Sequence, residues 1–135
     1  MKLTRASSYA LHAVAFMAQQ KQQDKPMASH NIAAARTIPE RFLLKVLKPL
    51  VSAEVLHSIK GPNGGYRLAK PANEITMLDI LEAVDGPIRG QSPFTYMEGD
   101  GNLDKRLEAI CNQSAEQMRK QLQKVRISEL ASSKG

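Results

Sequence analysis

A glycine-rich basic segment, Lys60-Gly-Pro-Asn-Gly-Gly-Tyr66, is the part of this sequence whose residue types and spacing best suit chemistry. No large side chain lies between its two ends, so its backbone can approach another surface closely. Lys60 and Arg67 flank the tip, and their cationic heads can contact phosphates or enter a narrow groove of DNA. Because short apolar runs stand on both sides, residues 55–69 predict a β-hairpin with a basic tip.

Two other interpretations of this segment stay open from its residues alone. It can be an ordinary glycine-rich turn without a ligand, or a loop that binds the phosphates of a nucleotide. The second interpretation is weakened because neither G-x-G-x-x-G nor G-x-x-x-x-G-K-S/T occurs in the chain. The elements on either side of this segment must therefore decide between these interpretations.

The segment before the hairpin predicts two short helices joined by a turn. Ser29 is a suitable cap for a helix that runs through Ala35. Pro39 suits the first position of a second helix, which we expect to end near Lys48. Pro49 is expected to end it, because proline cannot donate the helical hydrogen bond.

The two faces of the second helix differ in chemistry. One face is apolar and is expected in the core: Leu43, Val46, Leu47 and Leu50. The other is basic with one leucine: Arg41, Leu44, Lys45 and Lys48. Two helices followed by a hairpin with a basic tip indicate a winged helix-turn-helix, whose usual function is to bind DNA. The predicted fold class is mainly α with a small β-hairpin.

Further helices frame this unit. Thr4 is expected to cap a helix over residues 5–20, and Thr76 a helix over residues 77–85. Residues 87–102 show no periodicity and predict a loop or a partly disordered segment.

A long helix is predicted from Leu103 onward. Its stripe, at spacings of three and four, consists of Leu103, Leu107, Ile110, Cys111, Ser114, Met118, Leu122 and Val125. So small a chain has few elements to cover this stripe, so we expect the same helix of a second copy to pair with it. Packing on the first helix of its own chain is the alternative. The predicted domains are a winged helix-turn-helix over 1–86, the loop over 87–102, and a dimerisation helix with a tail over 103–135.

Charge is unevenly distributed along the 135 residues, whose net charge is +6. Residues 1–71 hold 11 Lys and Arg against 3 Asp and Glu, whereas residues 72–135 hold 8 against 10. A polyanion bound by the first half explains this asymmetry, since phosphate neutralisation supplies most sequence-independent affinity for nucleic acids. A basic surface kept only for solubility is the alternative.

The chain lacks the residue patterns of common enzymes and of membrane proteins. Neither G-x-S-x-G nor H-E-x-x-H occurs, and the single cysteine, Cys111, excludes a disulfide or a four-cysteine metal site within one chain. No apolar stretch is long enough for a membrane span or a secretory signal. We therefore expect a cytoplasmic protein that is not an enzyme, binds no membrane and holds no cofactor.

Several motifs together resemble a known family. They are Met1-Lys-Leu-Thr4, Tyr9-Ala-Leu11, Ile32-Ala33, Ile38 through Leu50, Lys60-Gly-Pro-Asn-Gly-Gly-Tyr-Arg-Leu68, Ile75-Thr-Met-Leu-Asp-Ile80, Glu82-Ala-Val-Asp-Gly86 and Ile127-Ser-Glu-Leu130. Through almost its whole length the chain resembles the Rrf2 family of bacterial winged-helix transcription regulators. The resemblance implies a homodimer on double-stranded DNA with a palindromic operator. The helix from Pro39 to about Lys48 would enter the major groove, and the hairpin, or wing, the minor groove.

The resemblance also implies which residues contact DNA. Arg41, Phe42 and Lys45 fall where the family's recognition helix meets DNA, and a basic wing residue corresponds to Lys60. Leu44 departs from the family, whose members often carry a polar or acidic base-reading residue at this position. Leucine can offer only an apolar contact, such as one to a thymine methyl. The complete set expected at DNA is Thr4, Arg5, Ser29, Pro39, Glu40, Arg41, Phe42, Leu44, Lys45, Lys48, Lys60, Gly61, Pro62, Asn63, Gly64, Gly65, Tyr66 and Arg67.

A second departure concerns the iron–sulfur cluster of some family members. Those members carry three cysteines before the long helix, but residues 87–110 contain none. Some members use a histidine of the first helix, which makes His12 and Cys111 the remaining candidate ligands. Two ligands per subunit make a poor site. We therefore expect no iron–sulfur cluster and interpret His12 as a core residue of the first helix.

The predicted function is a sequence-specific DNA-binding transcriptional regulator, and more narrowly a dimeric repressor. The alternative is a protein-interaction module, or a redox- or ligand-responsive regulator whose main output passes through a protein partner. Cys111 is the candidate for a redox response, although a buried thiol among apolar neighbours is usually inert.

Overall fold

The computed structural model describes residues 1–89 and 101–132 of the chain. Its elements are α1 (Arg5–Ala18), α2 (Ser29–Arg36), α3 (Glu40–Ser52), β1 (Leu56–Ile59), β2 (Gly65–Leu68), a 3-10 turn (Ala72–Glu74), α4 (Met77–Asp85), α5 (Gly101–Gln123) and α6 (Ile127–Ala131). The predicted fold class is confirmed. Most of the loop expected over 87–102 lies outside the described residues. No helix in the described ranges has the length and apolar composition that a membrane span requires.

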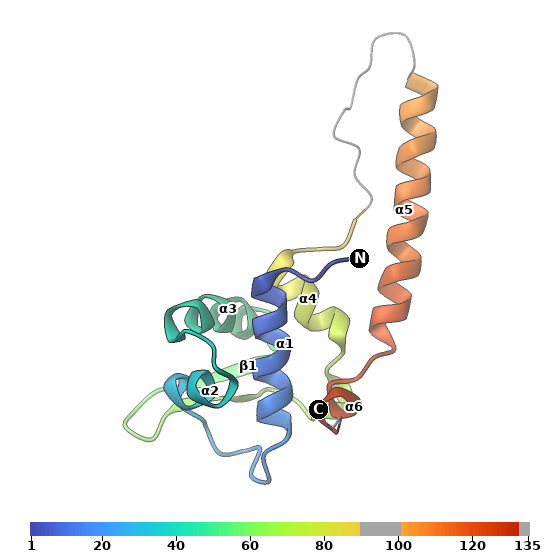
Figure 1. Ribbon diagram of the computed structural model, residues 1–135. Coiled ribbons are helices and arrows are strands. Elements are labelled where there is room, and N and C mark those ends of the chain that lie inside the picture. Colours follow the sequence, from blue (N-terminus) through green and yellow to red (C-terminus); the bar gives the residue numbers. More distant parts are fainter. Residues whose placement is uncertain (90–100, 133–135) are drawn as a thin grey trace.

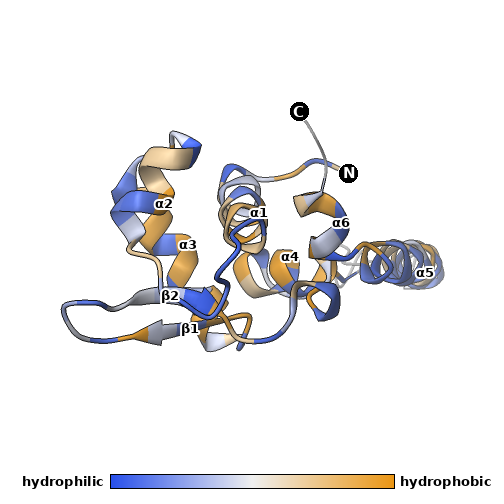
Figure 2. Ribbon diagram, turned by 90° about the horizontal axis from the view of Figure 1, so that it is seen from below, coloured by the Kyte–Doolittle hydropathy of each residue, from blue (hydrophilic) through white to orange (hydrophobic). Residues whose placement is uncertain are grey.

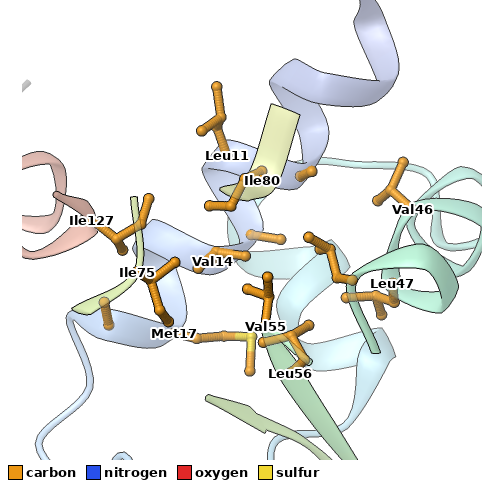
Figure 3. Close-up of a cluster of buried hydrophobic side chains, with 14 of the residues drawn as sticks. Leu11, Val14, Met17, Val46, Leu47, Val55, Leu56, Ile75, Ile80 and Ile127 are labelled. Atoms are coloured by element: carbon orange, nitrogen blue, oxygen red, sulfur yellow. The ribbon is translucent and has the colours of Figure 1, made fainter. Parts of the chain in front are cut away.

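Helix α1 lies in the middle of the molecule, with α2, α3 and the hairpin on one side and α4, α5 and α6 on the other (Figure 1). Ala10, Ala13 and Val14 of α1 are fully buried, and these small residues let α3, α4 and α6 pack against it. Side chains of the core meet in one cluster around α1: Leu11, Val14, Met17, Val46, Leu47, Val55, Leu56, Ile75, Ile80 and Ile127 (Figure 3).

Thr4 caps α1, as the sequence predicts. The backbone N–H of Ser7 donates to Thr4 Oγ1 at 2.9 Å. The Thr4 hydroxyl donates to the carboxylate of Asp85 at 3.0 Å, which joins the start of α1 to the end of α4. The helix ends at Ala18, slightly before the expected boundary.

His12 is not a core residue, and the expectation that it lies inside is wrong. Its side chain is exposed, because it is on the face of α1 opposite the buried stripe. Nδ1 of His12 lies 2.6 Å from the guanidinium Nη2 of Arg36 at the end of α2. The histidine therefore links the exposed surfaces of two helices.

The turn between α2 and α3 differs from prediction at its start. Ala28, not Ser29, is the N-cap of α2, and no side chain caps that helix. The Ser29 hydroxyl instead donates to Oε1 of Glu40, the first residue of α3, at 3.1 Å. Thr37 ends α2 in the left-handed conformation (φ 55°), and buried Ile38 closes the turn. The two helices form the expected helix-turn-helix.

Helix α3 continues past Pro49, so the expected end near Lys48 is wrong. Pro49 deprives the carbonyl of Lys45 of its usual helical donor, yet the helix extends to Ser52. Leu50 in the last turn is fully buried, and this burial favours the extra turn by about 1.5–3 kcal/mol. Tertiary packing thus outweighs the lost hydrogen bond.

The hairpin, which we call the wing, lies where the sequence predicts it. Strands β1 and β2 are antiparallel, with Leu56 opposite Leu68. At the tip, the N–H of Gly64 donates to the carbonyl of Gly61 at 3.0 Å, with Pro62 in the position after Gly61 that its fixed φ suits. The tip is therefore a tight turn.

A second backbone pairing joins the wing to the segment before α2. Met27 and Tyr66 exchange two N–H···O hydrogen bonds, each 2.8 Å long. Gly65 has φ +148° and lies so close to this pairing that a Cβ atom there would overlap the Met27 carbonyl. Only glycine fits at this position. The two hydrogen bonds between Met27 and Tyr66 hold the wing beside the helix-turn-helix (Figure 2).

Helix α4 begins and ends as predicted. The Thr76 hydroxyl accepts from the N–H of Asp79, and the Asp79 carboxylate accepts from the N–H of Thr76, both at 3.0 Å. This reciprocal capping box satisfies two backbone donors at the helix start. Gly86, with φ 86°, ends the helix.

The C-terminal tail folds back onto the core. Helix α5 ends at Gln123, so Val125, predicted on its stripe, lies beyond it. The reason is a backbone pairing: the Met77 N–H donates to the Val125 carbonyl, and the Ile127 N–H donates to the Ile75 carbonyl, both at 2.8 Å. Ile127 is fully buried, and α6 packs against α1.

An ion pair fixes the base of α5 to α4. Nε and Nη2 of Arg119 donate to the two carboxylate oxygens of Glu82 at 3.1 and 3.0 Å. The N–H of Ile88 donates to the same carboxylate at 2.9 Å. Leu122 is buried in the core, and Met118 packs against the same core. These two stripe residues therefore contact their own chain.

We expect Gly65→Ala to lower the free energy of unfolding by about 1–3 kcal/mol, because the added methyl group and the unfavourable φ both strain the wing. Urea denaturation measures the change. Gly101→Ala is the matched control, since a Cβ there meets nothing within 4 Å. If both variants were equally stable, the close approach of Met27 would not constrain the fold.

The hydrogen bonds from Arg119 hold the pKa of Glu82 below its ordinary value. A carboxyl group with a lowered pKa stabilises the fold above its unfolded pKa, and this contribution disappears as the pH falls through the folded pKa. We therefore expect Glu82→Gln to be less stable than wild type at neutral pH and the difference to shrink in acid. Thermal unfolding across the pH range measures this. Glu116→Gln, which removes an exposed contact to Arg119, is the control. If the stability lost in Glu82→Gln relative to wild type did not depend on pH, the prediction would be contradicted.

Candidate nucleic-acid interface

The exposed face of α3 carries a row of basic side chains. Arg41, Lys45 and Lys48 are exposed, and Leu44 among them is 43% exposed. The opposite face is buried in the core: Leu43, Val46, Leu47 and Leu50. The predicted division of the helix into a core face and a basic face is confirmed.

Phe42 organises two of these basic residues. Its half-buried ring has the Arg41 guanidinium carbon 4.8 Å and the Lys45 Nζ 5.6 Å from its centroid. Cations within about 6 Å of an aromatic face are attracted by the ring quadrupole. The ring therefore holds both cationic heads close to the helix surface.

An acidic group lies at the edge of this basic face. Glu40 is exposed and accepts a hydrogen bond from Ser29. Within the described residues its carboxylate makes no ion pair with Arg41, Lys45 or Lys48. Pro39 precedes it as the N-cap of α3. The start of the helix thus presents a carboxylate to solvent.

The wing tip projects on the same side of the molecule as α2 and α3 (Figure 2). Lys60, Gly61, Pro62 and Asn63 are all exposed. Gly64, in contrast, lies so close to the Ile59 carbonyl that a Cβ atom would overlap it. The tip therefore offers one cationic side chain on a backbone that has little bulk around it.

Arg67 and Tyr66 lie at the base of the wing. Nη1 of Arg67 donates to the carbonyl of Asp24, in the loop after α1, at 3.4 Å. The Tyr66 ring packs against the core. Arg67, which the sequence places beside the tip with Lys60, pairs instead with His57 in the strands of the wing.

Thr4 and Arg5 lie at the end of α1 that is away from the wing (Figure 1). The Thr4 hydroxyl is already engaged with Asp85 and as the helix cap. Arg5 is exposed.

The outer half of α5 carries exposed apolar side chains. Leu103, Leu107 and Ile110 are 49%, 45% and 58% exposed. Cys111 and Ser114, from the same predicted stripe, are also exposed. Leu107 and Ile110 therefore present apolar surface to solvent in the part of the chain that the structure describes.

The described residues do not bring together the ligands of an iron–sulfur cluster. In the described ranges no three His, Cys, Asp or Glu side chains gather in a way that could hold a metal ion. Cys111 lies on the exposed face of α5, and His12 is engaged with Arg36. A cluster needs several thiolate or imidazole ligands, which this arrangement does not assemble.

Two contacts between remote segments were missed by sequence reasoning. Met27 pairs with the wing across 39 residues of sequence, and a lone methionine after a proline gives no signal of such pairing. Glu82 and Arg119, which form an ion pair, are also far apart in the sequence. The requirement for glycine at Gly65 was the available hint, because a glycine inside a strand often marks close approach of another backbone.

Comparison with known proteins identifies the family. A family model named Rrf2 and described as an iron-dependent transcriptional regulator matches residues 3–133. Protein aau3 of Rhizobium meliloti is 35% identical over 85 residues, which are 63% of this chain and 54% of that protein. The HTH-type transcriptional regulator CymR of Bacillus subtilis is 31% identical over 100 residues, covering 74% of this chain and 70% of CymR. The chain spans about half the length of the first curated relatives it matches.

Solved structures share the fold. The structure of CymR, described as the global cysteine regulator of B. subtilis, has a TM-score of 0.75 and 27% identity, and covers 100% of this chain and 99% of that one. IscR of T. potens has a TM-score of 0.70 at 18% identity, covering 100% of this chain and 94% of that one, which is a likeness of fold alone. From the full-length family match, the chain belongs to the Rrf2 family of transcriptional regulators.

Proposed function

We propose that this regulator is a dimeric repressor that binds a palindromic operator in double-stranded DNA. The observation that carries the proposal is the exposed basic face of α3, with Arg41 and Lys45 ordered on the Phe42 ring, next to a wing anchored by Met27. We infer a cytoplasmic location, because the DNA that a bacterial regulator binds is there.

In the proposed complex α3 enters the major groove, whose width of about 12 Å admits a helix. Residues near the start of a recognition helix contact base edges, which favours Arg41 as the reader of a guanine. Leu44, one turn later, offers an apolar contact to a thymine methyl. Lys45 and Lys48 then lie further along α3, within reach of phosphates.

The wing has a different proposed role from α3. Its exposed tip carries Lys60 on a slim backbone, which suits phosphate contact or entry into the minor groove. Arg67 is held by Asp24, so we propose that it braces the base of the wing. A phosphate contact supplies affinity without sequence information.

The dimer forms through the outer half of α5 in this proposal. The exposed side chains of Leu107 and Ile110 favour burial against a partner. A second copy supplies an identical stripe, and two-fold symmetry then matches a palindromic operator. We further propose that the protein works without an iron–sulfur cluster, since the described residues do not assemble its ligands.

We expect Arg41→Ala to relax the base preference at one position of each half-site, with a loss of about 1–3 kcal/mol on the preferred sequence. Lys60→Ala should instead weaken all sequences alike and reduce the salt dependence of binding. Sites selected from genomic DNA with wild-type protein, followed by footprinting and binding at several salt concentrations, measure both effects. Lys124→Ala, on the far side of the molecule beyond α5, is the control. Failure of the wild type to protect any selected site would contradict DNA binding.

We expect the double variant Leu107→Glu, Ile110→Glu to dissociate into monomers, because four like charges per dimer would enter the apolar contact. Sedimentation velocity measures the association state, and circular dichroism checks that the helices remain. Lys105→Glu lies on the opposite face of α5 and should leave the association unchanged. Wild-type protein that sediments as a monomer at micromolar concentration would refute the proposed interface.

A further inference from the structure

The carboxylate of Glu40 is placed where a DNA-binding surface gains least from a negative charge. It belongs to the first residue of α3 and is exposed at the edge of the basic face. Phosphate groups repel it, so its presence lowers affinity for DNA of any sequence. The helix dipole favours a carboxylate at this position in the free protein, and on DNA the carboxylate can gain a further contact only from a hydrogen-bond donor. In the major groove such donors are the amino groups of base edges.

The surroundings of Glu40 leave it available for such a contact. The Ser29 hydroxyl donates to Oε1 at 3.1 Å and so restricts where the side chain can turn. Arg41 and Lys45 are drawn to the Phe42 ring and form no ion pair with Glu40 in the described structure. One carboxylate oxygen therefore stays open to solvent at the end of the helix that contacts bases in helix-turn-helix proteins.

We propose, building on the proposed DNA-binding function, that Glu40 determines specificity by accepting a hydrogen bond from the N4 amino group of a cytosine. Cytosine presents only this donor in the major groove, whereas adenine places its N7 acceptor beside its N6 donor. The N7 lone pair repels a carboxylate, so cytosine is preferred. Ser29 acts as a positioning residue that aims the carboxylate.

Glu40→Gln tests the charge with little change in shape. The amide oxygen still accepts from Ser29, but the amide group also donates and therefore suits adenine. We expect discrimination in favour of cytosine at one base pair per half-site to fall about tenfold or more, the size of a lost base contact. Affinity for non-specific DNA should rise, because a negative charge has been removed.

The experiment selects DNA sites with wild type, Glu40→Gln, Ser29→Ala and the control Glu74→Gln, which removes an exposed carboxylate from the 3-10 turn. Binding is then measured on the wild-type operator and on versions with each base at the affected pair. Ser29→Ala should lose part of the cytosine preference with an unchanged melting temperature. A merely structural Glu40 would alter the melting temperature and leave the base preference intact.

The outcomes separate this inference from the function beneath it. If wild type selects no common sequence, the DNA-binding function itself fails. If wild type selects an operator and Glu40→Gln selects the same one with equal cytosine preference, Glu40 does not determine specificity. Loss of preference for a base other than cytosine would also overturn the assignment, and a Ser29→Ala variant identical to wild type would overturn the role given to Ser29.

Discussion

The close packing of small residues along α1 is the constraint on which the rest of this structure depends. Ala10 and Ala13 are fully buried, and α3, α4 and α6 all pack against the same helix. A larger side chain at either alanine would push these helices apart, since protein cores tolerate little added volume. The basic face of α3 points outward only because its apolar face is committed to this core. The same contacts place α4, and through it the base of α5, on the other side of α1.

The wing depends on a second constraint, which acts on backbone instead of side chains. A two-stranded hairpin alone is marginally stable in water, but here β2 also pairs with Met27. The segment that carries Met27 leads directly into α2, so the wing and the helix-turn-helix are parts of one unit. A ligand that contacts both α3 and the wing therefore meets a surface whose two parts are already positioned, which lowers the ordering cost of binding.

Local signals in the sequence predicted much of this fold, and tertiary contacts account for the rest. Thr4 and Thr76 were recognisable caps because a cap acts within one turn of its helix. The exposed basic row on α3 followed from a spacing that is equally local. Pro49, in contrast, breaks a local rule, and only the burial of Leu50 explains why the helix continues. The engagement of Arg67 with Asp24 joins segments 43 residues apart, which no periodicity reveals.

The two halves of α5 have different neighbours, and this difference matters for how a regulator of this shape is controlled. The base is held by Arg119 on Glu82 and by buried Leu122, whereas Leu107 and Ile110 further out are exposed. A helix of 23 residues is about 35 Å long, close to the separation of half-sites one helical turn of DNA apart. In the dimer we propose, a small rotation of α5 at the Glu82 contact displaces the other subunit's recognition helix by a much larger distance. In that proposed arrangement, the contact between Glu82 and Arg119 joins the proposed dimer helix to the core that carries α3, even though it lies outside the basic face of α3 and the wing.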